Sequence, residues 1–99
     1  MLIVNQHEEK IVNLDKVTDI EIVRDYDCDE DINTIRSVDI IARTENKSIL
    51  LGTYKNEKDA KTVLKLITKQ YEFCNEECFN SYGYVKNGVF YISNVILEE

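Results

Sequence analysis

Carboxylates are the side chains of this sequence best suited to bind a cation. Five of them fall within seven residues, namely Asp25, Asp27, Asp29, Glu30 and Asp31. Alternating aspartates open a calcium-binding loop, but such a loop also needs glycine at its sixth position and glutamate at its twelfth. Counted from Asp25, those positions hold Glu30 and Arg36. We therefore expect a solvated acidic loop without a tightly bound ion, which leaves it as a candidate contact for a cationic partner.

The thiols and the imidazole are the other groups able to ligate a metal. They supply the donor atoms of a Cys3His zinc site: Cys28, Cys74, Cys78 and His7. Cys74 and Cys78 are close in sequence, but no spacing brings the other two donors to them. Both also fall on the apolar side of a predicted helix, where free cysteine is a common core residue. We expect reduced, partly buried cysteines, no metal, no cofactor and, without a local Cys–His signature, no catalytic residue.

The elements that position these groups begin with five predicted strands. Their segments alternate apolar and polar residues or hold β-branched runs. They are MLIVNQ, IVNLD, VTDIEIVR, TIRSVDIIART and SILLGTY. In the fourth segment, we expect Val38, Ile40 and Ala42 to face the core. Short turns join the segments outside the acidic loop, which favours an antiparallel meander.

A helix is predicted after the fifth strand. Asn56 is a suitable N-cap, and apolar residues then recur three and four apart through Ile67 and Tyr71. The spacing predicts a helix over about 57–73, and the same apolar stripe would allow it to continue to 78. We expect the opposite face to be solvated and not to bind DNA, because the negative charge of the whole chain opposes a polyanion. That face carries Lys58, Lys61, Lys65 and Lys69.

The last part of the chain predicts a β-hairpin. Asn87-Gly88 lies between β-branched and aromatic runs, and both residues of such a turn adopt positive φ. Pairing outward from the turn places Tyr84 opposite Tyr91, and we expect Tyr82 to line the same face, away from the core. Tyrosine is enriched at protein interfaces, although half-exposed aromatic pairs also stabilise ordinary sheets.

The final strand is predicted to be longer than its hairpin partner. Residues 94–97 extend past the hairpin and include Val95 and Leu97. An apolar edge of this kind needs a partner, either the first strand of the same chain or the same segment of a second copy. We expect a homodimer, because a domain of this size gains core by sharing one.

Length and charge restrict the remaining possibilities. The 99 residues, 43% of them hydrophobic, predict a single globular domain spanning 1–99. A net charge of −7 argues against nucleic acid and anionic membrane surfaces as partners. Because the apolar runs are too short for a signal peptide or a membrane span and the cysteine count is odd, we expect a cytoplasmic protein.

A pattern of short motifs runs along roughly residues 1–72. A first strand ends in glutamine, a second strand contains Val-Asn, and an LGTY strand precedes a helix with an early alanine. The residues concerned are Gln6, Val12, Asn13, Leu51, Gly52, Tyr54 and Ala60. The pattern resembles a group of small uncharacterised proteins from Firmicute bacteria and their phages. The resemblance implies a prophage or mobile-element setting and no known activity.

Together these elements predict an α+β fold, with an antiparallel sheet of about six or seven strands and the helix packed on one face. The leading hypothesis for function is a non-enzymatic protein-interaction module whose partner is unknown. The candidate contact residues are Asp25, Asp27, Asp29, Glu30, Asp31, Tyr82, Tyr84, Tyr91, Val95 and Leu97. Two alternatives stay open. One is an acidic inhibitor that mimics nucleic acid against a host defence or regulatory protein, and the other is a small metal-binding or hydrolytic protein.

Overall fold

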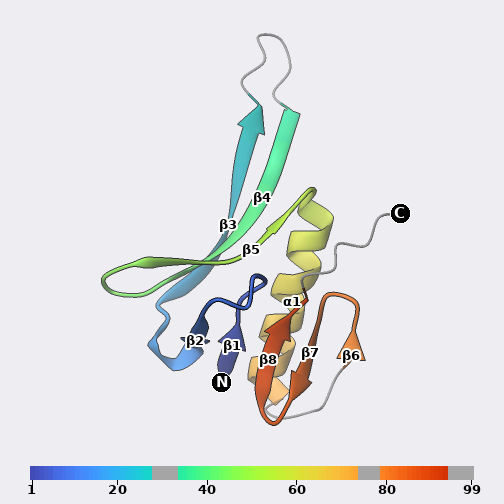
Figure 1. Cartoon of the computed structure of the whole chain (residues 1–99). Coiled ribbons are helices and arrows are strands. Elements are labelled where there is room, and N and C mark those ends of the chain that lie inside the picture. The colour runs from blue at the N-terminus through green and yellow to red at the C-terminus, as the bar shows by residue number, and fades with distance from the viewer. Residues whose placement is uncertain (28–33, 74–78, 94–99) are drawn as a thin grey trace.

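The chain folds into strands and an α-helix at the predicted segments. The computed structural model describes residues 1–27, 34–73 and 79–93 (Figure 1). In chain order the elements are β1 (Leu2–Val4), β2 (Ile11–Asn13), the 3₁₀ turn η1 (Leu14–Lys16), β3 (Asp19–Asp27), β4 (Thr34–Arg43), β5 (Ser48–Tyr54), α1 (Glu57–Phe73), β6 (Phe79–Asn80), β7 (Gly83–Lys86) and β8 (Val89–Ile92). The α+β class is confirmed, as is the helix over 57–73. Its predicted continuation to 78 lies outside the described residues.

β8 occupies the centre of a five-stranded sheet with the order β2-β1-β8-β7-β6. β1 runs parallel to β8, with Val4 opposite Tyr91, and the other neighbouring strands are antiparallel. At the turn between β7 and β8, Asn87 and Gly88 have φ angles of 53° and 77°. Tyr84 lies opposite Tyr91, so the predicted hairpin and its register are confirmed.

β4 is the centre of a separate antiparallel sheet with the order β3-β4-β5. β5 ends where Tyr54 lies opposite Val38, whereas β3 and β4 continue to pair as far as Asp27 and Thr34. The β3–β4 hairpin therefore projects beyond β5 as a two-stranded arm, at the top of Figure 1. This arm carries the start of the acidic stretch away from the helix and the five-stranded sheet.

The strands form two sheets rather than the predicted single antiparallel sheet. The chain leaves the first sheet at η1, where the backbone N–H of Asp15 donates to Asn13 Oδ1 at 3.0 Å. The N–H of Leu14 donates to the carbonyl of Met1 at 2.9 Å, which ties the turn back to the first strand. Because η1 redirects the chain before β3, the predicted five-strand meander is interrupted. β1 pairs with residues 89–91, and the predicted pairing of 94–97 lies outside the described residues.

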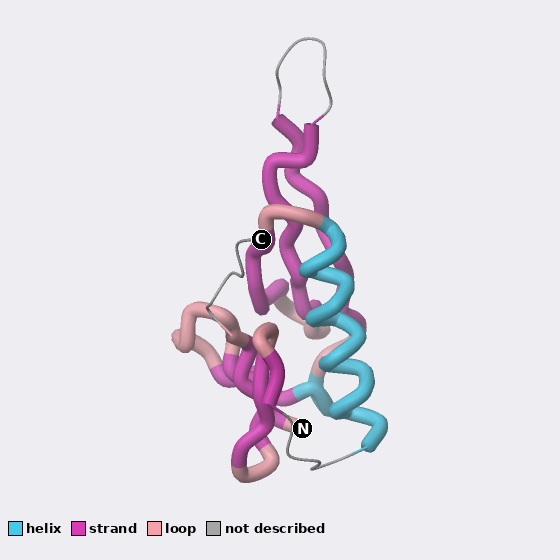
Figure 2. Tube along the Cα trace, turned by 90° about the vertical axis from the view of Figure 1, so that its right-hand side faces the viewer, coloured by secondary structure: helices cyan, strands magenta, loops and turns pink. Residues whose placement is uncertain are grey.

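The core lies where both sheets meet α1. Figure 2 shows the helix running along one side of the two sheets. Val38, Ile40 and Ala42 of β4 have no exposed surface, as their alternation predicted. Ile3 and Phe90 of the five-stranded sheet belong to the same buried cluster, so the helix joins two sheets into one core. Each such large aliphatic or aromatic side chain contributes about 1.5–3 kcal/mol through burial.

The buried face of α1 differs from the predicted stripe near its C-terminal end. Ala60, Val63 and Ile67 are buried, as their spacing predicted. Gln70 takes the next buried position, because residues spaced three and seven apart continue the line that faces the sheets. Tyr71, which we expected on the apolar stripe, is 52% exposed and lies at the border of the buried face.

Two buried polar residues join the sheets. The N–H of Gln6 donates to the carbonyl of Leu51 at 2.8 Å, and Gln6 Oε1 accepts the N–H of Thr53 at 2.8 Å. Asn5 Nδ2 donates to the carbonyl of Leu50 at 3.3 Å. The chain after β1 thus satisfies backbone groups along the edge of β5, which an exposed edge strand would leave to solvent or another chain.

Candidate interaction surface

The side of the five-stranded sheet that faces away from the core carries two apolar rows. The strand register places Ile11, Val4, Tyr91 and Tyr84 side by side in one row. Leu2 and Val89 are neighbours in the second row. Alternate residues of the same strands belong to the core cluster, so the six lie on the opposite side of the sheet. Val4 is itself buried there, at 9% exposure, and the other five are exposed or half-buried. We refer to them as the outer apolar face: Leu2, Val4, Ile11, Tyr84, Val89 and Tyr91.

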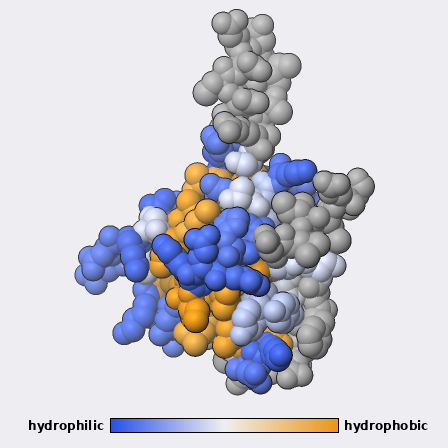
Figure 3. All heavy atoms as spheres, viewed as in Figure 1, coloured by the Kyte–Doolittle hydropathy of each residue, from blue (hydrophilic) through white to orange (hydrophobic). Residues whose placement is uncertain are grey.

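Two aliphatic residues of the outer apolar face are unusually exposed. Ile11 retains 69% of its surface and Leu2 retains 40%. In Figure 3, hydrophobic atoms gather over the area that β1 and β2 occupy in Figure 1. Single exposed apolar residues are common, but a contiguous patch of them typically marks a binding surface.

The aromatic half of the outer apolar face is preorganised. The rings of Tyr84 and Tyr91 stack across the two strands, with centroids 5.0 Å apart and planes 12° apart. Both side chains are half-buried. A cross-strand aromatic pair of this geometry stabilises the hairpin and holds two large rings in fixed positions. A partner would therefore meet a rigid aromatic surface.

Tyr82 does not belong to this face, contrary to prediction. It lies in the turn before β7, where it packs against the core, and its hydroxyl donates to Asp59 Oδ1 at 3.0 Å. The prediction extended the strand alternation one residue too far, because β7 begins at Gly83. Tyr82 thus ties the hairpin to the first turn of α1.

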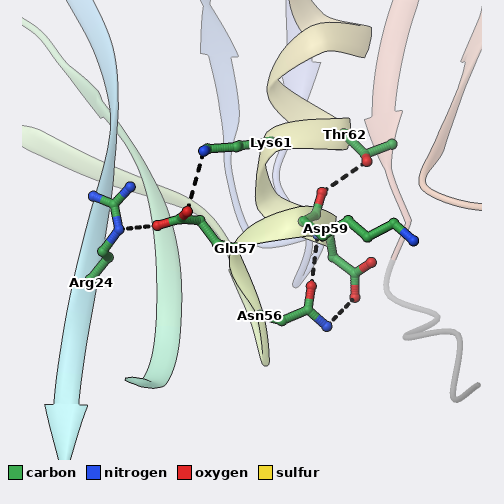
Figure 4. A network of polar contacts seen from close by, with 7 residues as sticks. Arg24, Asn56, Glu57, Asp59, Lys61 and Thr62 are labelled. Carbon is green, nitrogen blue, oxygen red and sulfur yellow. Dashed lines mark hydrogen bonds and ion pairs between the residues drawn. The ribbon is translucent and has the colours of Figure 1, made fainter. Parts of the chain in front are cut away.

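The N-terminus of α1 is held by a network of polar contacts (Figure 4). Asn56 Oδ1 accepts the N–H of Asp59 at 2.9 Å, which confirms Asn56 as the N-cap. Glu57 pairs with Arg24 of β3 and with Lys61 at 3.2 Å, one turn further along the helix. The hydrogen bond from Arg24, followed by that from Lys61, lowers the pKa of Glu57 below its usual value. These contacts fasten the helix to the three-stranded sheet.

The Tyr54 hydroxyl is a buried polar group beside this network. It has no hydrogen-bond partner among the described residues, although the tyrosine is only 5% exposed. Burial raises the pKa of Tyr54 well above its ordinary value, and the negative charge of Asp59 raises it further. Tyr54 therefore holds its proton and is a poor nucleophile or base.

A shallow groove of about 330 Å³ lies between α1 and the segment that links the sheets. Most of its surface is apolar, and the exposed Tyr71 contributes to it. It is lined by Leu14, Val17, Asp19, Ile20, Ile67, Thr68 and Tyr71. A second hollow, of about 460 Å³, follows the lysine side of the helix and is lined by Glu57, Lys58, Lys61, Thr62 and Lys65.

The structure places only part of the predicted acidic site. Asp25 is exposed on β3, and the backbone of Asp27 pairs with Thr34 near the end of the arm. The remaining acids of the stretch, Asp29, Glu30 and Asp31, lie outside the described residues. The same holds for Val95 and Leu97 of the predicted apolar edge and for Cys28, Cys74 and Cys78.

The described residues contain neither a metal-binding cluster nor a membrane-spanning helix. Within 1–27, 34–73 and 79–93, no three His, Cys, Asp or Glu side chains are placed to share a metal ion. In the same ranges no helix has the length and apolar character needed to cross a membrane.

Comparisons of the chain with protein-family models, with curated proteins and with solved structures found no match.

Sequence reasoning identified the tyrosines of the outer apolar face but missed its aliphatic half. Tyr84 and Tyr91 follow from the Asn87-Gly88 turn, which fixes their register. Leu2 and Ile11 become neighbours of these rings only through the parallel pairing of β1 with β8. The available signal was the alternation in β1 and β2, which puts Leu2 and Ile11 opposite the core side of their strands.

Proposed function

We propose that this chain is a protein-interaction module that binds its partner through the outer apolar face. The observation that carries the proposal is the 69% exposure of Ile11 within a continuous apolar row that ends in the stacked Tyr84–Tyr91 pair. Rigid tyrosines beside exposed aliphatic side chains are the composition of protein-interface centres, because both release water on contact and lose little conformational entropy.

The chemistry of the described polar groups also favours binding. Glu57 and Asp59 are engaged in contacts that fasten α1, and the raised pKa of Tyr54 keeps that hydroxyl neutral. These groups stabilise the fold. On the outer apolar face, by contrast, Ile11 and Leu2 remain exposed at a cost in hydration.

Co-purification from the native host tests the proposal. The tagged chain is compared with Leu2→Lys, and Leu50→Lys serves as the matched control because Leu50 is 38% exposed on the other sheet, close to the 40% of Leu2. We expect the co-purifying protein, or a tagged second copy, to be lost with Leu2→Lys and kept with Leu50→Lys. Equal retention by both variants would refute the proposal.

The projecting β3–β4 arm supports a second candidate, an acidic inhibitor that mimics nucleic acid. The arm extends past β5 and carries the exposed Asp25 away from the body of the molecule. An acidic surface on a narrow projection can enter a basic groove that a flat surface cannot. Replacing Asp25 and Asp27 with asparagine distinguishes the two functions, because it should weaken only an interaction made by the arm.

A further inference from the structure

We propose that the open edge of β3 binds an extended segment of a partner protein, in which lysine or arginine alternates with apolar residues. The segment adds a strand to the three-stranded sheet, next to β3 and opposite β4. This surface is separate from the outer apolar face, which belongs to the five-stranded sheet.

β3 is the one long open strand edge among the described residues. The five-stranded sheet ends in β2 and β6, which are only three and two residues long. The outer edge of β5 is covered by Asn5 and Gln6. β3 is nine residues long and, within the described part of the chain, pairs only with β4. An edge of this length presents a row of backbone N–H and C=O groups with which another strand can pair.

The regular part of this edge spans residues 19–25. β3 and β4 keep one register from Asp19 to Asp25, and a bulge follows between Asp25 and Tyr26. Bulges twist an edge and interrupt strand pairing, so the added strand should end there. The bound segment is therefore about seven residues long.

The charges along β3 favour a basic segment. Asp19, Glu21 and Asp25 lie on the same side of the sheet, because side chains alternate along a strand. Glu21 pairs with Arg43 of β4, whereas Asp19 and Asp25 are exposed and form no ion pair with another described residue. Basic residues on this side of an added strand would lie beside these carboxylates, and opposite charges on neighbouring strands attract. The net charge of −7 favours the same partner at long range.

The same charges disfavour a second copy of this chain as the added strand. Two β3 strands paired edge to edge would place carboxylates beside carboxylates on one side of the sheet, which destabilises the pair. Charges on an edge strand protect a protein from pairing with itself in this way. A basic segment meets no such repulsion, so the charge pattern admits it and selects against the copy.

The core side of β3 favours apolar residues at the alternate positions of the segment. Ile20 and Ile22 are half-buried and pack against the core. Ile20 also lines the shallow groove of about 330 Å³, together with Ile67 and Tyr71 of α1. An apolar side chain placed next to Ile20 would lie at this groove and remove apolar surface from water. The two sides of β3 thus specify a segment in which basic and apolar residues alternate.

A synthetic peptide of about seven residues, alternating lysine with valine and blocked at both ends, serves as the probe. Fluorescence anisotropy measures its affinity for the full chain, which should fall as salt is added. Asp19→Asn combined with Asp25→Asn should weaken binding about fivefold. Glu8→Gln combined with Glu9→Gln is the matched control, because it changes the net charge equally at another exposed site. This control should leave the affinity within about twofold of the native value.

N-methylation of the peptide tests whether it binds as a strand. In an extended peptide the N–H groups of all the lysines face one neighbour, and those of all the valines face the other. Methylating one set therefore blocks pairing with β3, and methylating the other set does not. We expect exactly one of the two methylated peptides to lose binding. Amide hydrogen exchange within residues 19–25 should also slow when the unmethylated peptide binds.

The results can overturn this binding mode without touching the proposed function. Absence of binding at about 1 mM peptide overturns it, as does equal binding by both methylated peptides. Equal weakening by the two pairs of substitutions overturns it as well, because net charge alone would then account for the affinity. Slower exchange on β1 and β8 in place of β3 overturns it and supports the outer apolar face. Co-purification with Leu2→Lys tests the proposed function separately, so the two proposals can fail independently.

Discussion

Replacing Gln6 with methionine should weaken the junction between the two sheets by about 1–2 kcal/mol. The variant keeps the length of the side chain but removes Oε1, which accepts the N–H of Thr53 at 2.8 Å. Gln6 is only 2% exposed, so water cannot easily replace the lost acceptor. An unpaired buried donor costs about 1–3 kcal/mol, and the buried methionine recovers part of this through its apolar surface.

Urea unfolding followed by circular dichroism measures this change. A loss of about 1–2 kcal/mol at a slope of about 2 kcal/mol per molar urea lowers the midpoint by roughly 0.5–1 M. Gln70→Met is the matched control, because Gln70 is also buried at 3% but its Oε1 has no partner among the described residues. We expect Gln70→Met to cost less than Gln6→Met. Equal losses would refute the view that Gln6 stabilises the fold through Thr53.

Three further outcomes follow from other contacts. Tyr54→Phe should leave stability unchanged or raise it by up to about 1 kcal/mol, because the buried hydroxyl lacks a described partner. The raised pKa of Tyr54 means that native stability falls as pH rises above about 10, because the unfolded chain loses a proton there that the folded chain keeps. Tyr54→Phe should reduce this fall in stability at high pH. Gly83→Ala should cost about 1–3 kcal/mol in thermal unfolding, since the new Cβ would lie 2.3 Å from Phe90 Cε1. In an NMR titration, Glu57 should titrate below its ordinary pKa, and Arg24→Gln should raise that pKa. An unchanged Glu57 titration would contradict the pairing.

Local patterns predicted most elements of this fold because each pattern has a local physical cause. The three- and four-residue spacing after Asn56 gave the helix, and the positive φ required at Asn87-Gly88 gave the hairpin. No local pattern determines how the strands are arranged into two sheets. A period of two assigns residues to faces but does not select neighbouring strands, so the parallel pairing of β1 with β8 was not predictable.

The candidate surface was also predictable only where local pairing determines it. Tyr84 and Tyr91 were assigned correctly to one face, because the turn fixes their pairing over a few residues. Tyr82 was misplaced because β7 begins only at Gly83, so the alternation of the strand does not extend to Tyr82. Leu2 and Ile11 were missed because their importance depends on a contact between segments far apart in the chain, which no local pattern encodes.

The motif residues and the candidate surface occupy different parts of the molecule. Gln6 bonds to the backbone of β5, and a side chain at Gly52 would place its Cβ 2.7 Å from the Tyr54 hydroxyl. These residues therefore secure the junction between the sheets. A protein that shares them would be expected to share that junction, whatever it binds. The outer apolar face lies on the five-stranded sheet, on the side that faces away from the core. Residues such as Ile11 can therefore change without disturbing the junction. Under the proposed function, partner choice depends on the outer apolar face, so a chain with the same motif but a charged residue in place of Ile11 should fold alike and bind differently.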